Sequence, residues 1–154
     1  MEWNEIKDKI YRWDGSWRDI YILGTTIDDW RLWINFVNRA EKIRWVNPLS
    51  SINEAQIQFE VIAPYLQLEQ FSGSTVSFWI APTIQVNSHF FEVGKIENDI
   101  DPREVCSVND HIAVINYMKS VYYLLGKEVI LTDENHESHV LVKVNESVEY
   151  TSNG

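Results

Sequence analysis

The sequence predicts an α+β fold: a mainly antiparallel sheet with about three helices packed on one side. Helical patterns dominate the start of the chain, strand patterns its middle, and one long helix with two strands its end. The strict alternation of strands and helices that marks a parallel sheet is missing. No repeat or linker interrupts the 154 residues. We therefore expect a single domain over residues 1–148 and a flexible C-terminal tail over residues 149–154.

The first part of the chain predicts two amphipathic helices separated by a strand. In the first helix, apolar residues recur every three or four positions. These residues are Trp3, Ile6, Ile10 and Trp13. A strand follows over residues 18–24, and Thr26 with Asp29 has the pattern that caps a second helix. The apolar stripe of the second helix is Trp30, Trp33, Ile34 and Val37.

A short strand is expected over residues 43–46, but residues 51–70 admit two interpretations. Ser51 and Glu54 have the spacing of a helix cap, and apolar residues that follow share one helical face. Residues 56–61 instead alternate between polar and apolar side chains, as a strand does. Periodicity leaves both interpretations open.

The second half of the chain predicts five strands and the longest helix. The strands are expected over residues 75–81, 83–91, 95–101, 129–132 and 140–144. The helix begins at the capping residue Ser107 and ends at Gly126. Its expected apolar residues are Ile112, Ile115, Met118 or Lys119, Tyr122 and Leu125.

The chain is acidic, with 13 Lys and Arg residues against 23 Asp and Glu residues, which leaves a net charge of −10. Such a charge repels phosphates and anionic lipids, so we expect no binding to nucleic acid or membranes. It attracts a basic protein partner, although solubility alone would also account for it. No apolar run could span a membrane, residues 1–5 lack the features of a signal peptide, and the single cysteine cannot form an internal disulfide. These observations favour a cytoplasmic location.

One segment near residue 100 carries an acidic residue at every second position. Glu97, Asp99 and Asp101 lie on one face if the segment is a strand. Such a face attracts lysines and arginines of a partner or a divalent cation, and it is also typical of a solvated sheet surface. We predict that these three residues bind a partner, together with Trp79 and Trp17 as exposed aromatic contacts.

The sequence carries no recognisable catalytic set. His136 and His139 are three residues apart in a polar turn, without the spacing of zinc peptidases. The glycine-rich motifs of hydrolases and nucleotide-binding proteins are missing. Arg18 and Asp19 are expected to form a weak surface ion pair, and Cys106 to be a small buried apolar residue. We therefore assign no catalytic residue, metal ligand or cofactor, and favour a protein that is not an enzyme.

The main functional hypothesis is a small acidic interaction domain that docks a basic protein. An inhibitor or bacterial immunity protein that neutralises a basic toxin enzyme fits this description, because opposite charges accelerate association. The alternative is a small-ligand or metal-binding domain, an enzyme included, that uses the acidic strand or the turn with His136 and His139. A ligand pocket lined by aromatic residues between sheet and helices is a third hypothesis.

Overall fold

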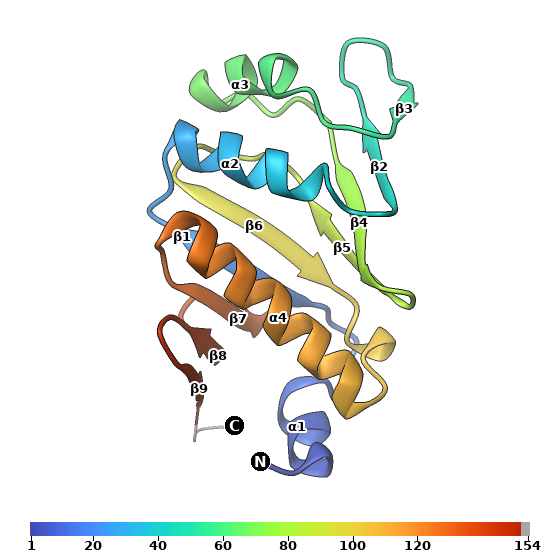
Figure 1. The fold of residues 1–154 in the computed structure, drawn as a ribbon, viewed down its shortest axis with the longest axis vertical. Coiled ribbons are helices and arrows are strands. Elements are labelled where there is room, and N and C mark those ends of the chain that lie inside the picture. The colour runs from blue at the N-terminus through green and yellow to red at the C-terminus, as the bar shows by residue number, and fades with distance from the viewer. Residues whose placement is uncertain (152–154) are drawn as a thin grey trace.

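The computed structural model describes residues 1–151, which form four α-helices, one short 3-10 helix and nine strands (Figure 1). The helices are α1 (Trp3–Ile10), α2 (Ile27–Val37), α3 (Phe59–Gln67), the 3-10 helix η1 (Pro102–Glu104) and α4 (Val108–Leu125). The strands are β1 (Arg18–Leu23), β2 (Ile43–Val46), β3 (Asn53–Glu54), β4 (Val76–Ala81), β5 (Ile84–Ser88), β6 (Lys95–Ile100), β7 (Val129–Asp133), β8 (Val140–Val144) and β9 (Val148–Tyr150).

All nine strands belong to one antiparallel sheet in the order β3-β2-β4-β5-β6-β1-β7-β8-β9. β1 lies inside the sheet, between β6 and β7. Helices α2 and α4 cross the same face of the sheet (Figure 1). The predicted α+β class with an antiparallel sheet is therefore confirmed. The sheet is large, and there are four α-helices in residues 1–151 where about three were expected.

The face towards α2 and α4, here called the inner face, carries the apolar core. Ile20 and Ile22 of β1 are fully buried there, as are Trp30 and Trp33 of α2. The two tryptophan rings meet edge to face with their centroids 5.5 Å apart. Burying one isoleucine side chain stabilises the fold by about 1.5–3 kcal/mol. The stripe predicted for the second helix is thus part of the core.

The predicted helix ends form as expected at α2 and α4. The Thr26 side chain accepts a hydrogen bond from the backbone N–H of Asp29, and the Asp29 side chain accepts one from the backbone N–H of Thr26. The Ser107 side chain accepts a hydrogen bond from the backbone N–H of Asp110 at the start of α4. Gly126 ends α4 with a φ of +67°, a left-handed conformation that favours glycine. Local capping chemistry therefore sets the bounds of both helices.

Three local expectations are wrong. α1 ends at Ile10, so Trp13 lies beyond the helix and its side chain is 45% exposed. On α4, Ile112 is 47% exposed. The buried apolar residues of that helix are Val114, Ile115, Tyr117, Met118 and Val121. Apolar residues occur on most sides of α4, so spacing alone did not identify the buried side. Cys106 is exposed, in the link between η1 and α4.

Residues 51–70 follow neither predicted alternative completely. A helix does form, but α3 begins at Phe59, eight residues after the capping pattern at Ser51. Ile62 and Leu66 of α3 are fully buried. Before the helix, two residues form the short edge strand β3. The alternation over residues 56–61 does not lead to a strand there.

At the C-terminus, β9 pairs with β8 and ends at Tyr150. Part of the stretch expected to be a tail is therefore a strand, while residues 152–154 lie outside the described residues. Within residues 1–151, none of the helices has the length and hydrophobicity that a membrane-spanning helix needs.

Candidate functional site

The sheet face turned away from α2 and α4 is here called the outer face. It is polar on the strands in the middle of the sheet. Because side chains alternate along a strand, β1 and β6 direct isoleucines to the inner face and acidic residues to the outer face. The register places Asp19 opposite Asp99, and Asp99 opposite Asn87. Asn87 in turn lies opposite Ser77. A polar row therefore crosses the four neighbouring strands β4, β5, β6 and β1.

Asp19, Glu97 and Asp99 form the acidic cluster of the outer face. The Tyr21 hydroxyl donates to Oδ2 of Asp19 at 2.9 Å and lies 3.4 Å from Oε1 of Glu97. The backbone N–H of Asn135 donates to the same Asp19 oxygen at 2.7 Å. Asp19 and Tyr21 are buried. Glu97 and Asp99 are half-buried, so they form the accessible part of the cluster.

His89 extends the cluster on the side of β5. One oxygen of Asp99 accepts a hydrogen bond from Nδ2 of Asn87 at 2.9 Å, and the other lies 3.0 Å from Nε2 of His89. The hydrogen bond to Asp99 raises the pKa of His89. His89 is therefore the cationic group that the chain itself supplies to the cluster.

The acidic cluster carries negative charge that no lysine or arginine of residues 1–151 pairs with. Burial raises the pKa of Asp19, and the nearby charge of Asp99 raises it further. Burial also raises the pKa of Glu97, together with the charge of Asp19. No lysine or arginine in residues 1–151 forms an ion pair with the three carboxylates. Lys95 on β6 is engaged by Glu137.

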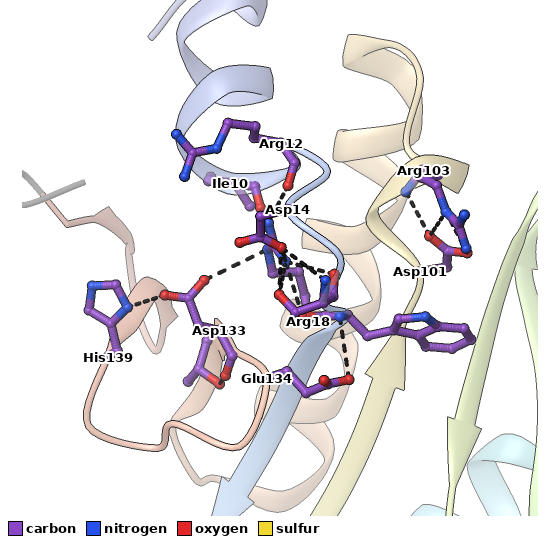
Figure 2. A network of polar contacts seen from close by, with 12 residues as sticks. Ile10, Arg12, Asp14, Arg18, Asp101, Arg103, Asp133, Glu134 and His139 are labelled. Carbon is purple, nitrogen blue, oxygen red and sulfur yellow. Dashed lines mark hydrogen bonds and ion pairs between the residues drawn. The ribbon is translucent and has the colours of Figure 1, made fainter.

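Asp101 lies just beyond the end of β6 and is not bonded to the acidic cluster. Its side chain caps η1 by accepting a hydrogen bond from the backbone N–H of Arg103 at 2.9 Å. The Arg103 guanidinium also binds this carboxylate, with 2.9 Å between Nη2 and Oδ2 (Figure 2). The hydrogen bonds from Arg103 hold the pKa of Asp101 below its ordinary value. An arginine therefore compensates the charge of Asp101, whereas Glu97 and Asp99 have no lysine or arginine partner in residues 1–151.

Trp79 and Trp17, the two predicted aromatic contacts, each have partners outside the cluster. Trp79 on β4 is half-buried, and Nζ of Lys42 lies 4.1 Å from the centroid of its ring. Trp17 precedes β1 and donates its backbone N–H to Glu134 at 3.3 Å. Within residues 1–151 we find no hydrogen bond or ring contact between either tryptophan and the acidic cluster.

Two phenylalanines that the sequence did not single out lie beside the cluster instead. Phe71 and Phe91 are 59% and 43% exposed, and their ring centroids are 5.3 Å apart. The Phe91 ring stacks on His89 at 5.5 Å, and His89 binds Asp99. This aromatic pair comes from two loops, so only the position of Phe91, two residues after His89, was a signal in the sequence.

The turn with His136 and His139 forms the loop between β7 and β8. His139 contacts the Asp133 carboxylate through Nδ1 (Figure 2). From the same loop, the backbone of Asn135 binds Asp19, and Glu137 binds Lys95. The loop therefore covers part of the outer face. In residues 1–151, no group of three or more His, Cys, Asp and Glu residues is placed to hold a metal ion.

Arg18, the neighbour of Asp19 on β1, is only 3% exposed and does not form the expected surface pair with Asp19. Adjacent strand residues point to opposite faces, so the two side chains diverge. The Arg18 guanidinium binds the backbone carbonyls of Ile10, Arg12, Ser16 and Trp17 (Figure 2). It also lies 3.5 Å from a carboxylate oxygen of Asp14 and 3.9 Å from one of Asp133. This charge holds the end of α1 and the following turn on the sheet.

Comparisons with protein-family models, with curated proteins and with solved structures find no match for this chain. A function is therefore inferred from the chemistry of the outer face.

Proposed function

We propose that this protein is an acidic interaction domain that docks a basic protein partner on the outer face of its sheet. Glu97 and Asp99 supply the negative charge, and the aromatic pair Phe71 and Phe91 supplies the apolar contact. The main support is that carboxylates without a lysine or arginine partner in residues 1–151 lie beside the exposed rings of Phe71 and Phe91. The finer proposal is that the partner is a toxin enzyme, and that the protein is its inhibitor or immunity protein.

Charge supports this proposal at long and short range. The net charge of −10 steers a basic protein towards the domain and increases the association rate. At contact, a partner cation meets carboxylates that the fold already holds in place, so less side-chain freedom is lost on binding. His89 competes with the partner for Asp99 while it is protonated. We therefore expect binding to strengthen as the pH rises and His89 loses its proton.

The combination of carboxylates and rings favours arginine as the contacting residue. A guanidinium pairs with a carboxylate through two parallel hydrogen bonds, and its flat face stacks on aromatic rings. Glu97 and Asp99 offer the carboxylates for the hydrogen bonds. Phe91 offers the ring, because its stack with His89 holds it near Asp99. A lysine would use only the charge.

The proposal is tested by partner capture and by association kinetics. Proteins of the source organism that bind the wild type are compared with those that bind the double variant Glu97→Gln and Asp99→Asn. We expect one basic protein to be lost from the variant. For that partner, the association rate of the wild type should fall at least tenfold between low and high ionic strength. The double variant should associate slowly even at low ionic strength.

A matched control removes the same charge elsewhere. Glu41 and Glu146 are exposed and lie outside β5, β6 and β1. The double variant Glu41→Gln and Glu146→Gln should retain the partner and most of the association rate. If the association rate falls equally in both double variants, the partner responds to the overall charge and does not bind the outer face. A rate that ignores ionic strength contradicts the proposal.

A further inference from the structure

A hollow of about 440 Å³ lies on the inner side of the sheet, between the end of α2, α4 and β4. α2 and α4 diverge towards β4 (Figure 1). Ala40 and Ala113, both small, line the space between them. A volume of this size is within the range of small-molecule sites. The hollow is on the opposite side of the sheet from the acidic cluster, so it is independent of the proposed docking face.

The inner wall of the hollow contains the aromatic rings of Phe36, Phe78 and Tyr117, of which Phe78 and Tyr117 are almost fully buried. Phe36 and Phe78 lie 6.3 Å and 5.6 Å from Tyr117, measured between ring centroids. The Tyr117 hydroxyl is already engaged, because it accepts a hydrogen bond from Nε1 of Trp33 and donates one to Oδ1 of Asn98. The Tyr117 hydroxyl is therefore not free to bind a molecule in the hollow. This wall suits a flat apolar or aromatic body.

The rim of the hollow is polar and basic. Arg39, Asn116 and Ser120 line it, all three exposed, and their side chains have no hydrogen-bond or ion-pair partner in residues 1–151. An adjoining hollow contains Lys42 and Glu41, and Glu41 forms no ion pair with Arg39 or Lys42. In a chain with a net charge of −10, Arg39 is therefore a cation available to a ligand.

We propose that this hollow binds a small molecule with a flat aromatic body and a single carboxylate. The body lies against Phe36, Phe78 and Tyr117. The carboxylate pairs with Arg39 at the rim, where a guanidinium offers two parallel donors. Asn116 and Ser120 donate hydrogen bonds to the same carboxylate. The positive charge of Arg39 favours an anionic ligand, because this otherwise acidic protein presents an unpaired arginine at the hollow.

The test uses 2-naphthoate as the probe and compares it with 2-naphthylmethylammonium, which has the same ring system and the opposite charge. Affinities are measured by isothermal titration calorimetry on the full chain. The overall charge favours the cation, so a preference for the anion can only come from a local site. We expect naphthoate to bind at least tenfold more tightly than the amine. Equal or tighter binding of the amine overturns the proposal, as does a lack of saturable naphthoate binding at millimolar concentration.

Two variants locate the binding site. Arg39→Gln should weaken naphthoate binding roughly tenfold, the loss expected for one charge-assisted contact, and leave binding of the neutral 2-naphthylmethanol unchanged. Ala113→Leu fills the hollow and should abolish the binding of both compounds. Arg12→Gln removes an exposed arginine at a different hollow and should change neither affinity. Unchanged naphthoate binding in Arg39→Gln, or in a folded Ala113→Leu, overturns the proposal.

Discussion

Arg18 and Asp19 are consecutive residues of β1, each 3% exposed, and they hold charge in opposite ways. Arg18 faces the end of α1, where backbone carbonyls and two carboxylates surround its guanidinium. Asp19 faces a second carboxylate, that of Asp99, and accepts hydrogen bonds from two donors, but within residues 1–151 it has no lysine or arginine partner. The first charge stabilises the fold. Burial raises the pKa of Asp19 and the charge of Asp99 raises it further, so the ionised form of Asp19 costs stability.

The largest expected effect is the loss of stability when Arg18 is replaced. Arg18→Met removes the donors to the backbone carbonyls of Ile10, Arg12, Ser16 and Trp17, together with the ion pairs to Asp14 and Asp133. We expect the free energy of unfolding to fall by about 3–5 kcal/mol. Urea denaturation measures this loss.

Arg18→Lys serves as the companion variant, because it keeps the charge and removes the planar fork of donors. We expect it to recover only a minor part of the stability. Full recovery would show that charge alone, and not the hydrogen bonds to the carbonyls, accounts for the role of Arg18.

A second buried group, His111, extends the comparison to a neutral side chain. Its ring nitrogens lie 2.6 Å from the hydroxyls of Tyr11 and Tyr150, so it links α1 and β9 to α4. Burial lowers the pKa of His111 from 6.5 to about 4. Its contribution is complete above pH 6.5 and is lost as the pH falls towards 4, because only the unfolded chain then takes up the proton. The loss should be about 2–3 kcal/mol.

Urea denaturation between pH 7.5 and 4 measures this dependence on pH. His111→Gln should lower the stability at pH 7.5 and flatten the profile between pH 6.5 and 4. His136→Gln, at an exposed position of the loop between β7 and β8, should keep the wild-type profile. A His111→Gln profile as steep as that of the wild type would contradict the assignment.

The smallest effect is expected when Asp19 is replaced, and here the stability should rise. Since the pKa of Asp19 is raised in the fold, ionisation costs stability as the pH rises through that pKa. Asp19→Asn removes the charge and keeps an oxygen that accepts from Tyr21 and Asn135. We expect a gain of about 1 kcal/mol at pH 7 that disappears near pH 3, where the carboxylate is protonated.

Thermal or urea unfolding at the two pH values measures this gain, with Asp8→Asn on the exposed side of α1 as the control. A loss of stability at pH 7 would mean that the fold requires the Asp19 charge. The contrast between Arg18 and Asp19 would then be lost, because both charges would stabilise the fold.

The fold was predictable from the sequence where the signals are local. Capping residues such as Thr26 and Ser107 bind their own helices, so their effect does not depend on distant parts of the chain. The start of α3 and the buried side of α4 depend on packing against other elements, which spacing does not contain. The same holds for Trp13, because α1 ends where Arg18, far along the turn, takes up the backbone carbonyls.

The candidate site was predictable to a smaller extent. Alternation along β6 places Glu97 and Asp99 on one face, as expected. The neighbourhood of Asp19 and Asp99 depends on the pairing of β1 with β6, and strand order does not follow from a single sequence. Phe71 joins Phe91 through the packing of two loops, for which no periodic pattern exists. The pairing of Asp101 with Arg103 was visible as neighbouring residues but was not used.

The position of β1 has a consequence for how the chain reaches its final form. This strand is made early, yet its neighbours on either side are residues 95–100 and 129–133. During synthesis both of its edges stay open until most of the polypeptide has left the ribosome, and such long loops close slowly. An open strand rich in isoleucine and tyrosine is prone to pair with other chains. We therefore expect both edges of β1 to be covered only once residues 129–133 have been synthesised.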